Sequence, residues 1–72
     1  MKKTWKLEDL DCAHCAQKMQ DAVAKIEGVR SVCVNFLAAR MTIEADEDKM
    51  DAVFAEAVRV CRRIEPDCRI VP

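Results

Sequence analysis

The 72-residue sequence predicts a small α+β domain in which two helices cover one face of a four-stranded antiparallel sheet. Two observations support this. Apolar residues alternate with polar ones in short segments, as in half-buried strands, and recur every three or four residues in two longer segments, as in amphipathic helices. These segments follow in the order strand, helix, strand, strand, helix, strand. No Pro-, Gly- or Ser-rich linker divides them, so residues 1–72 are expected to form one domain.

The first half of the chain contains a strand and then a helix. Trp5 and Leu7 alternate with polar neighbours, which predicts a strand. A helix is predicted over Ala13–Glu27, and Gly28, the only glycine, follows where a helix takes a left-handed C-terminal cap. The apolar positions with helical spacing are Ala16, Met19, Ala22, Val23 and Ile26.

The second half contains a hairpin, a helix and a last strand. Alternation over residues 31–36 and 40–44 predicts two strands joined by a short turn at residues 37–39. An acidic segment at 46–48 suits a helix N-terminus, and the helix is expected to end before Pro66. Its apolar face comprises Met50, Val53, Phe54, Ala57, Val58, Cys61 and Ile64. A short strand at about residues 68–71 completes the chain.

This element order is that of the ferredoxin-like split βαβ arrangement. Tracing the chain up and down through it brings three loops to one end: the loop after the first strand, the turn at 37–39 and the loop before the last strand. The acidic segment at 44–51 lies at the other end, where a solvated helix start is expected. Trp5, Met19, Met41 and Phe54 are spaced as core residues.

The composition excludes several classes of function. Twelve Lys and Arg balance thirteen Asp and Glu, and no basic run suggests nucleic acid as a partner. No apolar run, residues 36–39 included, approaches the ~20 residues of a membrane span, and the start lacks the apolar segment of a signal peptide. A cytoplasmic location is therefore expected. Five cysteines in that reducing compartment favour metal binding or redox chemistry over disulfides.

Cys12 and Cys15 fall where the first strand ends and the first helix begins. Residues three apart at a helix start can direct both sulfurs to one point, so two thiolates could share one metal ion. The helix N-terminus is expected to favour the thiolate form that metal binding needs. Structural zinc sites usually complete four protein ligands, whereas a pair in a loop implies ligand exchange.

The segments at residues 10–16, 26–29 and 31–36 resemble the heavy-metal-associated domain family, and the resemblance covers nearly the whole chain. Its members are metallochaperones, mercuric-ion-binding proteins and N-terminal domains of P-type ATPases that transport heavy metals. They bind metal through two cysteines separated by two residues, the CxxC motif. The resemblance implies that Cys12 and Cys15 are ligands and that the domain is not itself an enzyme. It also implies that the chain is the N-terminal domain of a heavy-metal-exporting P-type ATPase or a free-standing relative, and that it exchanges metal with ATPase domains or with a donor or acceptor protein.

Asp11, directly before the first cysteine, resembles the zinc, cadmium and lead exporters of this family. Zn(II) and Cd(II) accept oxygen ligands and favour four donors, whereas Cu(I) is satisfied by two thiolates. Asp11 is therefore expected to select Zn(II), Cd(II) or Pb(II) over Cu(I), although it could instead cap the helix. Asp9 adds a second carboxylate where many members have glycine.

Other residues near the site have competing interpretations. His14 is a minor candidate ligand but is expected to be solvated, and Cys68 could approach the ion but suits an ordinary strand position. Cys61 is expected in the core and Cys33 on the open face of the sheet. The competing functions are a copper or mercury carrier, in which Asp11 is only a cap, and a thiol-disulfide oxidoreductase using Cys12 and Cys15.

Overall fold

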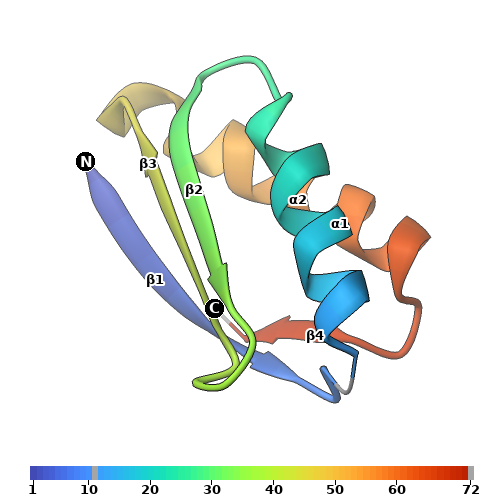
Figure 1. Ribbon diagram of the computed structural model, residues 1–72. Helices are drawn as coiled ribbons and strands as arrows, with labels where there is room; N and C mark the ends of the chain where they lie inside the picture. Colours follow the sequence, from blue (N-terminus) through green and yellow to red (C-terminus); the bar gives the residue numbers. More distant parts are fainter. Residues whose placement is uncertain (11, 72) are drawn as a thin grey trace.

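The computed structural model describes residues 1–10 and 12–71. Its elements follow the predicted order and confirm the ferredoxin-like architecture (Figure 1). They are β1 (Lys2–Glu8), α1 (Ala13–Ala24), β2 (Val29–Asn35), β3 (Arg40–Ala45), the 3-10 turn η1 (Glu47–Lys49), α2 (Met50–Ile64) and β4 (Arg69–Val71).

The four strands form one antiparallel sheet in the order β2-β3-β1-β4. Both helices lie on the same face of this sheet, and three loops gather at its lower end in Figure 1. They are the β1–α1, β2–β3 and α2–β4 connections, as predicted, whereas η1 lies at the opposite end. The Gln20 side-chain oxygen accepts the Val34 backbone N–H at 2.9 Å and ties α1 to the edge strand β2.

The core lies between the helices and the sheet. Trp5 and Met41 are opposite each other on β1 and β3, and the Trp5 ring stacks on Phe54 of α2 with centroids 4.9 Å apart. Trp5, Met19 and Met41 are buried, as their spacing predicted, and Phe54 is partly buried against this core. The other buried side chains include Leu7, Val23, Ile43, Val53, Ala57 and Cys61. Neither helix in the described part is long and apolar enough to cross a membrane.

The end of α1 differs from the prediction. The helix stops at Ala24, three residues before the predicted end at Glu27. Tight turns replace it, with the Ile26 N–H donating to the Val23 carbonyl at 3.0 Å. Gly28 does have the left-handed conformation, with φ of +100°, but it serves the turn into β2, where an added Cβ would lie 3.3 Å from a Val53 methyl group.

Smaller differences occur at three other boundaries. The acidic segment forms the turn η1 before α2 starts at Met50. Phe36 lies just beyond the end of β2, and Cys68 lies just before β4. Element ends depend on local hydrogen bonds that periodicity does not encode.

Candidate metal centre

Cys12 and Cys15 lie together at the start of α1. Cys12 is the N-cap residue, with extended backbone angles (φ −135°, ψ 115°), and its sulfur accepts the Cys15 backbone N–H at 3.3 Å. Both side chains are half-buried, and both are thiols, like the other three cysteines of the chain. The strand-to-helix junction therefore presents two adjacent sulfur donors that solvent can reach.

The expectation that the helix start favours thiolate at both cysteines is wrong for Cys15. Its pKa is raised to about 11, chiefly by the hydrogen bond between its side chain and Cys12, and further by burial and by the Glu65 carboxylate. The N-terminal N–H donor points at the Cys12 sulfur, so it stabilises negative charge there and not on Cys15. A metal ion that binds both sulfurs must therefore displace a proton from Cys15.

Glu65 is a candidate site residue that the sequence did not single out. It is the C-cap of α2, half-buried, and its backbone N–H donates to the Cys61 carbonyl at 2.8 Å. Its carboxylate acts on Cys15 by hydrogen bonding and by charge. The sequence predicted that the α2–β4 loop and the CxxC loop share one end of the molecule. A carboxylate in the α2–β4 loop was therefore a signal that could have indicated Glu65.

The predicted selector, Asp11, lies outside the described residues. The alternative role considered for Asp11 was capping of the first helix, and the N-cap residue of α1 is Cys12. His14 is exposed in the first turn of α1, as expected of a solvated imidazole. Within residues 1–10 and 12–71, no three Cys, His, Asp or Glu side chains lie close enough together to hold a metal ion.

Asp9 precedes the CxxC loop in an unusual conformation. Its φ of 60° lies in the left-handed region, which glycine adopts readily and Asp tolerates better than most residues. The side chain is exposed. Glycine would adopt this backbone conformation without strain, whereas Asp9 adopts it at some cost.

The other cysteines divide between surface and core. Cys33 is exposed opposite Thr42, on the face of the sheet away from the helices, as predicted. Cys61 is 1% exposed and belongs to the core, as predicted. Cys68 is 4% exposed and lies directly before β4.

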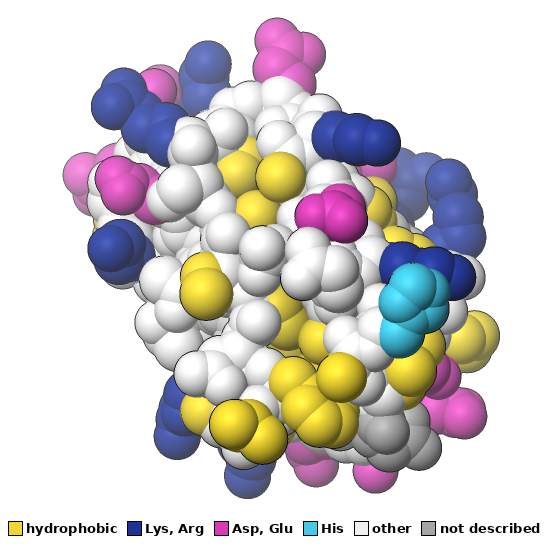
Figure 2. All heavy atoms as spheres, in the orientation of Figure 1, with side chains coloured by type: hydrophobic (Ala, Val, Ile, Leu, Met, Phe, Trp, Pro, Cys, Tyr) yellow, Lys and Arg dark blue, Asp and Glu magenta, His cyan; other side chains and the backbone are white. Residues whose placement is uncertain are grey.

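Apolar side chains gather at the loop end of the molecule, near the one histidine (Figure 2). Leu37, in the β2–β3 turn, is 94% exposed, and Ala13 and Ala38 are also exposed. A leucine so fully exposed, at the same end of the molecule as the accessible thiols, offers a surface that another protein could cover.

A small α+β domain with two accessible thiols at a helix start has the form of a soft-metal-binding module. Residues 4–63 match the model of the heavy-metal-associated domain, and the chain belongs to this family. Family membership and the close Cys12–Cys15 pair together support metal binding and transfer.

Three similar proteins illustrate the range of the family. The cadmium, zinc and cobalt-transporting ATPase of Bacillus subtilis (strain 168) is 32% identical over 92% of this chain, which spans 9% of that protein. The copper chaperone CopZ of the same organism is 33% identical, covering 67% of this chain and 70% of CopZ. The structure of a CopZ metallochaperone superposes with a TM-score of 0.77 at 20% identity, over 99% of this chain and all of the other, which shows the shared fold.

Proposed function

We propose that this domain binds a divalent Zn(II), Cd(II) or Pb(II) ion through Cys12 and Cys15 and exchanges it with another protein. The observation that carries the proposal is the pair of adjacent, half-buried sulfurs at the start of α1 in a chain of the heavy-metal-associated family. Two thiolates leave positions on such an ion open, so a partner's ligands can enter before the domain's own ligands leave.

Carboxylate oxygens support a divalent ion in preference to Cu(I). Glu65 acts on Cys15 from the α2–β4 loop, and Asp11 precedes Cys12 in sequence. Asp11 would join the two sulfurs as a third donor and leave a fourth position open, while Glu65 would add negative charge beside Cys15. Such mixed hardness suits Zn(II) and Cd(II) and offers Cu(I) little. The similarity to a cadmium, zinc and cobalt-transporting ATPase agrees with this choice.

A copper carrier is the second candidate. It is favoured by the similarity to the copper chaperone CopZ, which this chain covers over 70% of its length. In that function Cys12 and Cys15 alone would hold Cu(I), and neither carboxylate would contribute to affinity.

The proposed partner is a metal-transporting ATPase domain or a donor or acceptor protein in the cytoplasm. The exposed apolar side chains of Leu37, Ala13 and Ala38 lie at the same end as the cysteine pair and would contact this partner. Transfer by ligand exchange needs such close approach, because both proteins hold the ion at once.

Competition titration with metal indicators tests the choice of ion. Zn(II), Cd(II) and Cu(I) affinities would be measured for the wild type, Asp11→Ala, Glu65→Gln and the control Glu27→Gln, an exposed carboxylate at the opposite end. We expect each of the first two substitutions to weaken Zn(II) and Cd(II) binding by roughly tenfold or more, as lost ligands or supporting groups do, and to leave Cu(I) affinity unchanged.

The copper alternative makes the opposite prediction. Unchanged Zn(II) and Cd(II) affinities in both Asp11→Ala and Glu65→Gln, with two-coordinate sulfur-only Cu(I) in the native protein, would overturn the divalent assignment. Equal losses in Glu27→Gln would show that net charge alone is responsible.

A further inference from the structure

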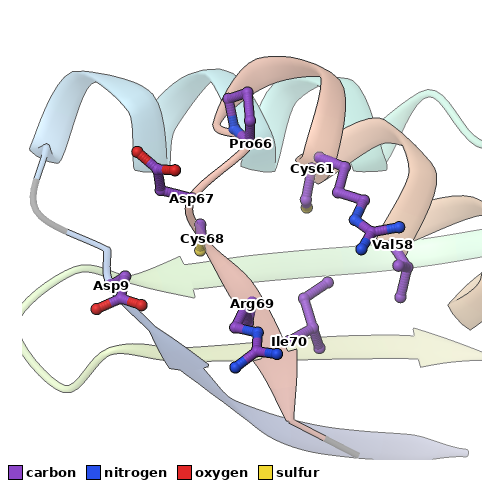
Figure 3. A pocket seen from close by; sticks show the side chains of 9 residues that line it. Asp9, Val58, Cys61, Pro66, Asp67, Cys68, Arg69 and Ile70 are labelled. Carbon is purple, nitrogen blue, oxygen red and sulfur yellow. The ribbon is translucent and has the colours of Figure 1, made fainter.

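A second pair of thiols lies beneath the α2–β4 loop. Cys61, in the last turns of α2, and Cys68, just before β4, line the same pocket of about 540 Å³ (Figure 3). They are 1% and 4% exposed. The proposed function uses neither of them.

The two thiols are close enough to influence each other. Burial, and secondarily the charge of Cys68, raises the pKa of Cys61 to about 12. The short connection between them is held by two backbone hydrogen bonds through Glu65, which donates to the Cys61 carbonyl at 2.8 Å and accepts the Cys68 N–H at 3.1 Å. The backbone positions of both cysteines are therefore well determined.

The pocket connects these thiols with the surface. Its inner lining includes the half-buried Val58 and Ile70, while Arg62, Asp67 and Arg69 are exposed. Figure 3 shows the Cys61 side chain pointing from α2 toward the space between α2 and β4, and Cys68 at the end of the loop that leads into β4. A small ion could thus reach both sulfurs along the pocket.

We propose that Cys61 and Cys68 form a second metal site, a buried two-sulfur site for a very soft divalent ion such as Hg(II). Binding exchanges two S–H bonds for two S–Hg bonds and releases two protons, with no change in oxidation state. The product carries no net charge, so the apolar surroundings impose little penalty on it, in contrast to a lone buried thiolate.

Zn(II) is not expected at this second site. It takes four ligands, and no third Cys, His, Asp or Glu among the described residues joins the pair to complete a site. The chain should therefore bind Hg(II) at two places and Zn(II) at one. This inference shares no ligand with the Cys12–Cys15 pair, so either proposal can fail while the other stands.

Mercury titration of the variant Cys12→Ser/Cys15→Ser/Cys33→Ser tests the proposal, because only Cys61 and Cys68 remain as thiols. Hg(II) would be added in the presence of a weak competing ligand, with sulfur-to-mercury absorbance and the ¹³Cβ shifts of both cysteines as readouts. We expect saturation at one equivalent, with both shifts moving together and the near-ultraviolet dichroism of Trp5 retained. Zn(II) should change neither readout.

The control adds Cys61→Ala to this variant and should abolish the two-sulfur absorbance. Saturation at two equivalents, no binding by the folded protein, or binding only with loss of the Trp5 signal would each overturn the proposal. If the alanine variant does not fold, the joint movement of the two ¹³Cβ shifts still decides the question.

Discussion

The two cysteine pairs of this domain have the same chemistry in different surroundings. Cys12 and Cys15 are half-buried at a helix start, with a backbone N–H directed at one sulfur. Cys61 and Cys68 are almost completely buried between a helix and a strand. The first pair can pass a bound metal ion to a partner protein, whereas the second pair can only retain an ion that enters the pocket. The two proposed sites therefore differ in solvent accessibility and not in residue type.

The largest expected effect separates the pairs by metal affinity. Cys12→Ser/Cys15→Ser should weaken Cd(II) binding by at least roughly a thousandfold, because protein ligands supply most of the binding free energy. Cys61→Ala should leave Cd(II) affinity unchanged. Titration against a chromophoric chelator measures both variants, and retained Cd(II) affinity in the double serine variant would refute the assignment of the ligands.

Substitution in the second pair should have the larger effect on the stability of the metal-free protein. Cys61→Ser places a hydroxyl in the core and should lower the free energy of unfolding of the metal-free protein by about 2 kcal/mol. Cys15→Ser, at a position that solvent reaches, should change it by much less. Urea unfolding followed by Trp5 fluorescence checks this, and equal losses in the two variants would mean that burial does not distinguish the pairs.

Alkaline pH should destabilise the metal-free protein. The pKa values of Cys15 and Cys61 are raised from 9.0 to about 11 and about 12 in the folded state, so the folded chain holds these protons longer than the unfolded chain. Stability is then complete below pH 9.0 and decreases as pH rises toward those values. Urea unfolding over this range should show a smaller decrease in Cys61→Ala, and identical slopes would contradict the cause given for the Cys61 shift.

The smallest expected effect concerns Asp9, which precedes the first pair and lines the pocket of the second. Asp9→Gly should raise the free energy of unfolding by about 0.5 kcal/mol, because relief of the left-handed strain exceeds the added freedom of the unfolded chain. Thermal unfolding would detect this change, with Cd(II) affinity as the companion measurement. A loss of stability would show that the Asp9 side chain stabilises the loop.

Much of the fold and part of the site could be predicted from the sequence. Alternation and helical spacing located the four strands and the two α-helices, though not the 3-10 turn η1. The order of these elements implied that the CxxC loop and the α2–β4 loop share one end. The end of α1 was missed because tight turns after Ala24 depend on local hydrogen bonds and on the packing of Gly28 against Val53.

Glu65 and the protonation of Cys15 could not be predicted in the same way. In sequence Glu65 is fifty residues from Cys15, in a mostly charged segment with no motif that points to the cysteine pair. Its effect on the thiol exists only after the end of α2 packs near the start of α1. The N–H bond from Cys15 to Cys12 is local, but it depends on Cys12 being the N-cap residue, which the spacing of the cysteines does not specify. The dipole of a helix predicts that its start favours negative charge, but it does not predict which of two sulfurs accepts the N–H.

The sequence by itself determined the order of elements, the apolar face of each, and the two cysteines placed three apart at a helix start, because these depend on local periodicity and spacing. Only the tertiary structure decided which carboxylate meets Cys15, and that Cys61 and Cys68 share one buried pocket. Those relations join residues far apart in the chain or on different elements, and burial and charge act through space rather than along the sequence.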